Sequence, residues 1–143
     1  MDIVIKRYDS LCDDARAIRE AVFVREQGFV NEFDDIDGNA VHFVLYVNGQ
    51  AAGTCRIYRG DDNEFHLGRL AVMSEYRGMS LGKMLISEAE GYASVIGAEF
   101  ITLSAQVRVK DFYKKCGYSA VGEEYLDEDC PHIKMVKKLS QPI

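Results

Sequence analysis

Proline is nearly absent from this sequence. Its two prolines, Pro131 and Pro142, lie near the C-terminus, and no repeat, low-complexity tract or Gly/Ser-rich stretch interrupts the rest of the chain. Such segments mark linkers and repeat architectures, so the sequence shows no internal boundary. A chain of 143 residues, 48% of them hydrophobic, can bury roughly two-thirds of its unfolded surface. We therefore expect residues 1–143 to form one domain.

Long apolar runs and an excess of positive charge are also missing. No stretch approaches the roughly 18 apolar residues that a membrane helix needs. The opening residues Met1 to Lys6 alternate apolar and polar like a strand, without the basic flank and apolar run of a signal peptide. The net charge is -6, whereas binding to nucleic acid in general needs a basic face. We therefore expect no membrane and no nucleic-acid partner, and any anionic ligand must be captured locally.

The cysteines show no pattern that indicates disulfide or metal chemistry. None of the four, Cys12, Cys55, Cys116 and Cys130, belongs to a CxxC motif, and the chain is long enough to fold without cross-links. Cys130-Pro131-His132 offers two metal ligands, but their nearest companions give no recognised zinc spacing. The sequence predicts reduced thiols, a cytoplasmic location and no metal.

An acidic segment, Asp34-Asp35-Ile36-Asp37, precedes the second predicted strand. A calcium loop of the EF-hand type would need acids at positions 33 and 44, which are Phe and Val. Two interpretations stay open. The segment is either a solvated loop or a loop that attracts a cationic amine.

Hydrophobic periodicity predicts an α/β (α+β) fold in which an antiparallel meander is followed by a helical crossover. Ser10 is the expected cap of the first helix, Asn48-Gly49 the expected hairpin turn, and Gly97 the expected end of a later helix. The expected strands are 3–5, 41–47, 51–58, 65–72, 100–103, 117–121 and 133–139, and the expected helices are 11–28, 81–96 and 109–115.

The segment after the strand 67–72 carries the strongest chemical signal. Gly78 and Gly82 let the backbone approach a ligand closely, and the first-turn amides and dipole of the following helix favour an anion. Arg77 and Lys83 add positive charge. A phosphate site is the hypothesis, although two glycines at a helix start also occur in ordinary strand-to-helix connections.

Two motifs resemble the GNAT superfamily of N-acetyltransferases. Arg77-Gly78-Met79-Ser80-Leu81-Gly82, directly after a Leu-Ala-Val strand, resembles the acetyl-CoA loop Arg/Gln-x-x-Gly-x-Gly/Ala, with Ser80 in place of the middle glycine. If that position requires positive φ, Ser80 costs about 1 kcal/mol. Downstream, Phe112-Tyr113 and Gly117-Tyr118 resemble the family's Phe-Tyr-x-x-x-Gly-Phe/Tyr segment. In the first half, residues 22–27 and 32–37 with His42 are similar to the ElaA-like branch.

The resemblance implies a GNAT-like acyl-CoA N-acyltransferase fold with a mixed central sheet of six to seven strands and flanking helices. It also implies an acetyl-CoA-dependent enzyme in which a primary amine, of a small molecule or a peptide, attacks the thioester directly in a ternary complex. The alternative is a non-catalytic acetyl-CoA-binding sensor or regulatory module, which could dispense with the catalytic groups.

Family roles transfer to matching residues of this chain. The backbone of Leu70, Ala71 and Val72 would hold the pantetheine, and the loop Arg77 to Lys83 would hold the pyrophosphate. Tyr113 matches the position whose hydroxyl protonates the leaving thiolate; otherwise it is a packed aromatic residue beside Phe112. Gln106 either binds the cofactor or ends its strand.

The general base is left open by the sequence. Glu64, His66 and Gly68 share one face of the strand that leads to Leu70. A histidine can accept a proton near neutral pH, so His66 is a candidate, and Glu64 or a relayed water are alternatives. Edge strands 117–121 and 133–139 also predict that two copies could form a homodimer.

Overall fold

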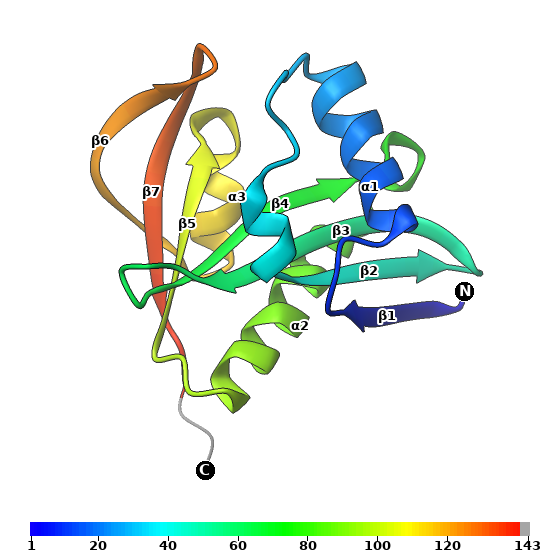
Figure 1. The fold of residues 1–143 in the computed structure, drawn as a ribbon, viewed down its shortest axis with the longest axis horizontal. Coiled ribbons are helices and arrows are strands. Elements are labelled where there is room, and N and C mark those ends of the chain that lie inside the picture. Colours follow the sequence, from blue (N-terminus) through cyan, green and yellow to red (C-terminus); the bar gives the residue numbers. More distant parts are fainter. Residues whose placement is uncertain (141–143) are drawn as a thin grey trace.

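The computed structural model describes residues 1–140, which form a seven-stranded sheet of order β1-β2-β3-β4-β5-β7-β6 flanked by helices (Figure 1). Among the strand pairs of residues 1–140, only β4–β5 is parallel. The expected mixed sheet with flanking helices is confirmed. The strands are β1 Ile3–Tyr8, β2 Val41–Val47, β3 Gln50–Arg59, β4 Phe65–Val72, β5 Phe100–Gln106, β6 Ser119–Asp127 and β7 Cys130–Lys138, and the α-helices are α1 Asp13–Arg19, α2 Leu81–Val95 and α3 Lys110–Lys115.

The expected hairpin between β2 and β3 is confirmed. Asn48 and Gly49 both have positive φ, at 49° and 82°, as the two central residues of a type I′ turn require. The turn sets the register in which Val47 opposes Gln50 and Phe43 opposes Cys55. The β-branched and aromatic residues of β2 are therefore presented to both faces of the sheet.

The first helix differs from the expectation at its start and along its length. Ser10 is not its cap: the helix begins at Asp13 after Cys12, which makes no side-chain capping bond. The helix then widens into a π-helical segment, η1, at Glu20–Glu26, and Gly28 follows with φ 80°. π-Helical turns are rare and are frequently found at functional sites, and this one lies beside the cleft described below.

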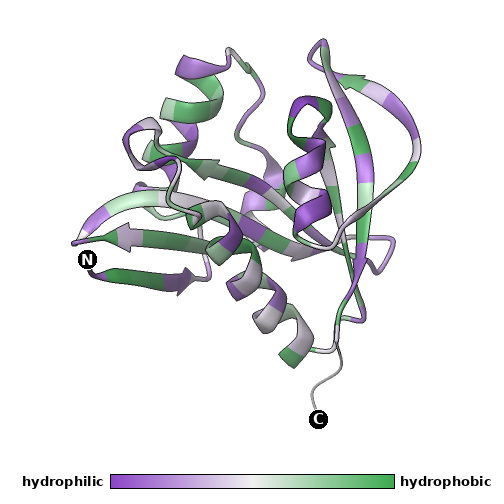
Figure 2. Ribbon diagram, turned by 180° about the vertical axis from the view of Figure 1, so that it is seen from behind, coloured by the Kyte–Doolittle hydropathy of each residue, from purple (hydrophilic) through white to green (hydrophobic). Residues whose placement is uncertain are grey.

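Two apolar clusters cover the two faces of the sheet. The ribbon coloured by hydropathy shows hydrophobic residues along the central strands (Figure 2). The larger cluster packs α2 against the sheet, and hydrophobic and hydrophilic residues accordingly alternate around that helix. The smaller one packs α1 and η1 against the opposite face. The larger cluster includes Phe43, Leu45, Ile57, Leu67, Leu85, Ile86, Ile101 and Met135, and the smaller includes Ala15, Ile18, Val22, Phe23, Val44 and Ala71.

The position of the site follows from the short pairing of β4 with β5. The two strands are paired only where Phe65 to Leu67 face Ile101 to Leu103. β4 continues to Val72 and β5 to Gln106 without further pairing between them. Beyond Leu67 and Leu103 the strands part, so the backbone groups that would join them face open space.

The C-terminal hairpin is longer than expected. β6 runs to Asp127 and β7 starts at Cys130, so that the Cys130-Pro131-His132 segment lies inside a strand. β6 is the outer strand, and all nine of its residues are exposed. An exposed edge of this kind can pair with another chain, and the homodimer stays a prediction. All four cysteines are free. Within the part of the chain described, no helix has both the length and the apolar character to cross a membrane.

Candidate active site

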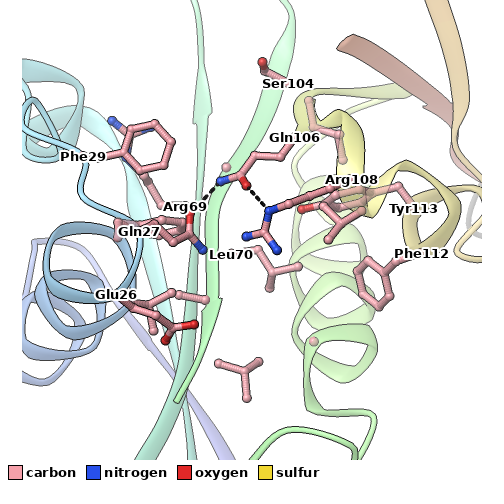
Figure 3. Close-up of a pocket in the computed structure, with 18 of the residues that line it drawn as sticks. Glu26, Gln27, Phe29, Arg69, Leu70, Ser104, Gln106, Arg108, Phe112 and Tyr113 are labelled. Carbon is pink, nitrogen blue, oxygen red and sulfur yellow. Dashed lines mark hydrogen bonds between the residues drawn. The ribbon is translucent and has the colours of Figure 1, made fainter. Parts of the chain in front are cut away.

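A cleft of about 720 Å³ lies where β4 and β5 part (Figure 3). One side, which we name the loop wall, consists of the end of β4, the loop before α2, and α3. The other side, the hairpin wall, lies on the opposite face of the sheet and consists of the segment after η1, the tip of the β6–β7 hairpin, and single residues of β4 and β5. The loop wall comprises Leu70 to Val72, Tyr76 to Gly82 without Met79, Arg108, Val109, Phe112 and Tyr113, and the hairpin wall comprises Phe29, Asn31, Glu32, Arg69, Ser104, Asp127, Glu128 and His132.

A bulge in β4 separates the two walls. Thr54 and Arg56 of β3 oppose Ala71 and Gly68, so one residue of β3 faces two of β4. Arg69, in the bulge, has φ 51°, a left-handed conformation that is uncommon for a residue with a Cβ. Bulges re-aim side chains at strand ends, and here Leu70 faces the loop wall while Arg69 faces the hairpin wall.

The loop before α2 has the geometry that a bound anion would need. Gly78 has φ 82° and Ser80 φ 61°, so the position occupied by Ser80 does require the left-handed conformation. No side chain caps α2, so its first-turn amides have no side-chain partner. A Cβ on Gly82 would lie 3.3 Å from Cζ of Phe112, which explains why the smallest residue stands where α2 and α3 approach each other.

Arg77 is held by an ion pair across the cleft. Its Nη1 and Nη2 donate to the two carboxylate oxygens of Glu26 at 2.7 and 2.8 Å, and its Nε donates to the Val72 carbonyl at 3.0 Å. The hydrogen bonds from Arg77 lower the pKa of the Glu26 carboxyl. Arg77 thus joins the end of β4 to η1 at the mouth of the loop wall. Lys83 and Met79 do not line the cleft.

Tyr113 lies in the loop wall with its hydroxyl free. The ring packs edge-on against Phe112 and Tyr118, at centroid distances of 5.1 and 6.1 Å. Its hydroxyl has no hydrogen-bond partner among residues 1–140. The buried side-chain polar atoms without a partner in that range are His42 Nδ1 and Arg56 Nε, so the Tyr113 hydroxyl is not fully buried. Burial raises the pKa of the Tyr113 hydroxyl, so this group stays protonated at neutral pH.

Gln106 bridges the cleft at the end of β5. Its Nε2 donates to Oε1 of Gln27 at 2.8 Å, and its Oε1 accepts from Nε of Arg108 at 2.8 Å. The side chain therefore connects η1 with the segment that leads into α3. It is the last residue of its strand and a lining residue as well.

The hairpin wall is assembled from segments far apart in the sequence. The Glu128 carboxylate in the β6–β7 turn accepts hydrogen bonds from the amides of Val30 and Asn31 at 2.8 and 3.1 Å. The His132 ring packs edge-on against Phe29 and stacks on Tyr125, at 6.5 and 6.1 Å between centroids. These contacts fix the segment after η1 against the C-terminal hairpin.

A network of ion pairs adjoins the hairpin wall and holds Glu32 of that wall in place. Arg19 donates to Glu32 at 2.8 Å and to Asp37 at 2.7 Å, and Arg56 donates to Asp34 and Asp37 at 2.7 and 2.8 Å. Arg69 contacts the Glu32 carboxylate at 3.0 Å and Asp34 at 3.3 Å.

Asp34 and Asp37 of the acidic segment are thus paired with arginines rather than solvated. Burial raises the pKa of the Glu32 carboxyl. For Asp37, burial acts in the same direction, but hydrogen bonds from Arg19 and Arg56 outweigh it and lower the pKa to about 2.

Besides Lys83 and Met79, both candidates for the general base, His66 and Glu64, lie outside the cleft lining. His66 stacks on Tyr58 at 5.0 Å between ring centroids, and its Nε2 lies 3.2 Å from Asp62. Glu64 is exposed and lies 3.9 Å from Lys134. Asp62, Glu64 and His66 have ligand atoms within 4.8 Å of one another, an exposed group at the start of β4. The structure therefore brings Tyr113, Gln106, Leu70 to Val72 and most of the loop together, and leaves His66 and Glu64 apart.

Sequence reasoning missed most of the hairpin wall. Arg69, Ser104, Asp127, Glu128 and His132 line the cleft, but they come from separate segments and form no local motif. Gln27 and Glu26 had a usable signal, because they belong to the segment 22–27 that resembles the ElaA-like branch.

Known proteins resemble this chain over nearly its whole length. YjcF of Bacillus subtilis (strain 168), an uncharacterised N-acetyltransferase, is 34% identical over 140 residues, covering 96% of this chain and 99% of YjcF. The crystal structure of an acyl-CoA N-acyltransferase from Pseudomonas aeruginosa matches with a TM-score of 0.81 and 28% identity over 95% of this chain and 98% of that one. Escherichia coli ElaA matches with a TM-score of 0.85 and 26% identity over 96% of this chain and 100% of that one.

The family follows from the sequence profile together with this geometry. The profile of the acetyltransferase (GNAT) domain matches residues 13–139, a range that contains both walls of the cleft. The expected resemblance to GNAT enzymes, with ElaA among the relatives, is confirmed. The chain belongs to the GNAT acetyltransferase family and is an N-acetyltransferase with the acyl-CoA N-acyltransferase fold.

Proposed function

We propose that residues 1–143 form one N-acetyltransferase domain that transfers the acetyl group of acetyl-CoA to a primary amine by direct attack in a ternary complex. The observation that carries the proposal is the opening between β4 and β5. An extended pantetheine arm can lie along the unpaired backbone of Leu70 to Val72 as an added strand would. The loop Gly78 to Gly82 and the uncapped start of α2 then face the pyrophosphate.

Each group of the loop wall has a role in this mechanism. The amides at the start of α2 bind the pyrophosphate, and the Val72 amide orients the thioester oxygen and stabilises the oxyanion. The Tyr113 hydroxyl gives its proton to the sulfur as the C–S bond breaks. Its free hydroxyl and raised pKa support this role. Lys83 lies on the exposed first turn of α2 and adds long-range attraction, and Gln106 with Arg108 closes the far end of the arm's path.

Arg77 must leave Glu26, at least in part, to meet a phosphate. Its guanidinium is 43% exposed, as is the Glu26 side chain, and exposed ion pairs contribute about 0–1 kcal/mol. A pyrophosphate can therefore compete for Arg77 at small cost. Four free cysteines are compatible with the reducing cytoplasm that the sequence predicts.

The test is a thermal-shift titration with acetyl-CoA, followed by thiol-release assays with a panel of primary amines. Acetyl-CoA at about 100 times its Kd should stabilise the protein by about 2.7 kcal/mol, and Arg77→Ala should weaken the shift. Arg25→Ala is the matched control, because Arg25 lies in η1 next to Glu26 but has a side chain that is 72% exposed and outside the cleft lining. No stabilisation at millimolar acetyl-CoA would refute the proposal, and binding without thiol release to any amine would indicate a sensor instead.

A further inference from the structure

His132 is a titratable side chain in the cleft to which neither motif assigns a role. It lies near the start of β7, is 7% exposed and lines the cleft. In the sheet it directly opposes Gln106 of β5 and Tyr125 of β6. Paired residues of antiparallel strands project to the same face, about 5 Å apart at Cβ. The imidazole therefore lies on the Ser104 and Gln106 face, opposite the face that packs against α2.

One hydrogen bond fixes the tautomer of this ring. Nδ1 of His132 lies 2.8 Å from the Cys130 carbonyl oxygen. A carbonyl oxygen can only accept, so Nδ1 carries the proton and Nε2 keeps its lone pair. Tyr125 and Phe29 hold the ring plane from two sides. The imidazole is thus oriented before any substrate arrives.

The Nε2 atom has no partner and is open to the cleft. No hydrogen bond to it exists within residues 1–140. It is also not one of the two fully buried side-chain polar atoms of that range that lack a partner, so it is accessible. His132 as a whole is 7% exposed and belongs to the cleft lining. A free, oriented lone pair in a cleft is what a general base requires.

The carboxylates of the hairpin wall are less suited to this role. Glu32 already accepts from Arg19 at 2.8 Å and faces Arg69 at 3.0 Å. Both oxygens of Glu128 accept backbone amide protons. Asp127, the last residue of β6, is exposed. The charged side chains that line the hairpin wall together with His132 are Glu32, Arg69, Asp127 and Glu128, and Lys134 lies two residues along the same strand face.

We propose that His132 is the general base that takes the proton from the attacking amine, a role that rests on the proposed acetyl transfer. As the amine nitrogen forms the C–N bond to the thioester carbon, Nε2 of His132 accepts the proton that nitrogen loses. The C–S electron pair goes to sulfur, which takes the proton of the Tyr113 hydroxyl. Return of the proton from imidazolium to the phenolate through solvent restores both groups, so the products are the amide and the free thiol.

The mechanism then has its base on the hairpin wall and its acid on the loop wall. The amine would approach between Phe29, Ser104 and His132, and the thioester from the side of Tyr113. Two proton-transfer groups on opposite sides of one reacting centre avoid competing for the same proton.

The decisive variant is His132→Asn, because the Asn amide can still donate to the Cys130 carbonyl but cannot accept a proton. We expect kcat to fall by about 10²- to 10⁴-fold, with the thermal shift by acetyl-CoA unchanged. His66→Asn, measured beside it, removes a histidine that lies on the same sheet face but does not line the cleft. A loss confined to His66→Asn, or a wild-type rate in His132→Asn, overturns the inference while leaving the acetyltransferase proposal intact. No thiol release by the wild-type protein overturns both.

Two further measurements separate a base from a structural residue. In His132→Ala, added imidazole should restore activity in proportion to the concentration of its unprotonated form. If His132 only filled space, the rescue would not depend on the protonation state of the added imidazole. Independently of activity, ¹⁵N chemical shifts of the His132 ring should show a protonated Nδ1 and a free Nε2 at neutral pH. The opposite tautomer, or rescue that follows the imidazolium form, would contradict the proposal.

Discussion

The two walls of the cleft are built in different ways. The loop wall comes mostly from one continuous stretch, the end of β4 and the turn into α2, and its proposed contacts are backbone amides and the hydroxyl of Tyr113. The hairpin wall gathers side chains from four separate parts of the chain, and buried ion pairs support it. If the proposed function holds, the side chains that meet the acceptor can vary without disturbing the turn that binds the acyl donor.

The largest effect on stability should come from breaking the buried ion pairs next to the hairpin wall. Arg19→Met leaves the buried carboxylates of Glu32 and Asp37 without their shared partner, and breaking a buried pair costs about 3–5 kcal/mol. The free energy of unfolding, measured by urea denaturation, should fall by that amount. Arg25→Met makes the same change at a site that is 72% exposed and should shift stability by less than about 0.5 kcal/mol. Similar midpoints for the two variants would contradict a structural role for the buried pairs.

On the loop wall, loss of Tyr113 should affect chemistry and not stability. Tyr113→Phe removes the proton donor to the leaving thiolate and keeps the ring packing, so we expect kcat to fall by about 10²-fold with the acetyl-CoA thermal shift retained. Tyr92→Phe, on α2 and packed against Phe43 at 5.9 Å, is the matched control outside the cleft. Steady-state kinetics on both variants check this, and an unchanged kcat for Tyr113→Phe would exclude the acid role.

The ion pairs should also give the hairpin wall a pH dependence. Asp37 has a folded-state pKa of about 2 against 3.8 ordinarily, so its contribution is present above about pH 4 and is lost as pH falls toward 2. The shift corresponds to about 2 kcal/mol. The raised pKa of Glu32 acts with the opposite sign, so the difference between wild type and Asp37→Asn isolates Asp37. Urea unfolding from pH 5 to pH 2 measures it, and parallel curves would refute the assignment.

The smallest effect concerns the left-handed residue of the loop. Ser80 has φ 61°, which glycine adopts without strain, so Ser80→Gly should stabilise the protein by about 0.5–1 kcal/mol. Ser87→Gly, inside α2, should destabilise it by about 0.5 kcal/mol, because glycine is a poor helix former. Thermal unfolding distinguishes the two signs. Destabilisation by Ser80→Gly would mean that the serine side chain contributes more than its backbone strain costs.

The sequence predicted the loop wall because its signals are local. A strand, a glycine-bearing turn and a helix start follow one another between residues 67 and 82, so their spacing in sequence is also their arrangement in space. The register of β2 and β3 was predictable for the same reason, since Asn48-Gly49 specifies its own turn. The start of α1 was predicted incorrectly, because packing rather than the Ser10 cap decides where the helix begins.

The sequence by itself determined the fold class, the loop before α2 and the candidate acid Tyr113. Only the tertiary structure decided that carboxylates of the acidic segment 34–37 are paired with arginines, that His66 lies away from the cleft, and that His132 faces into it. The reason is that Arg19, Arg56 and Arg69 reach those carboxylates from three different elements, and His132 meets Phe29 and Gln106 only because β7 lies beside β5. Contacts between segments far apart in the chain carry no periodicity or motif, so they become visible only once the sheet is assembled.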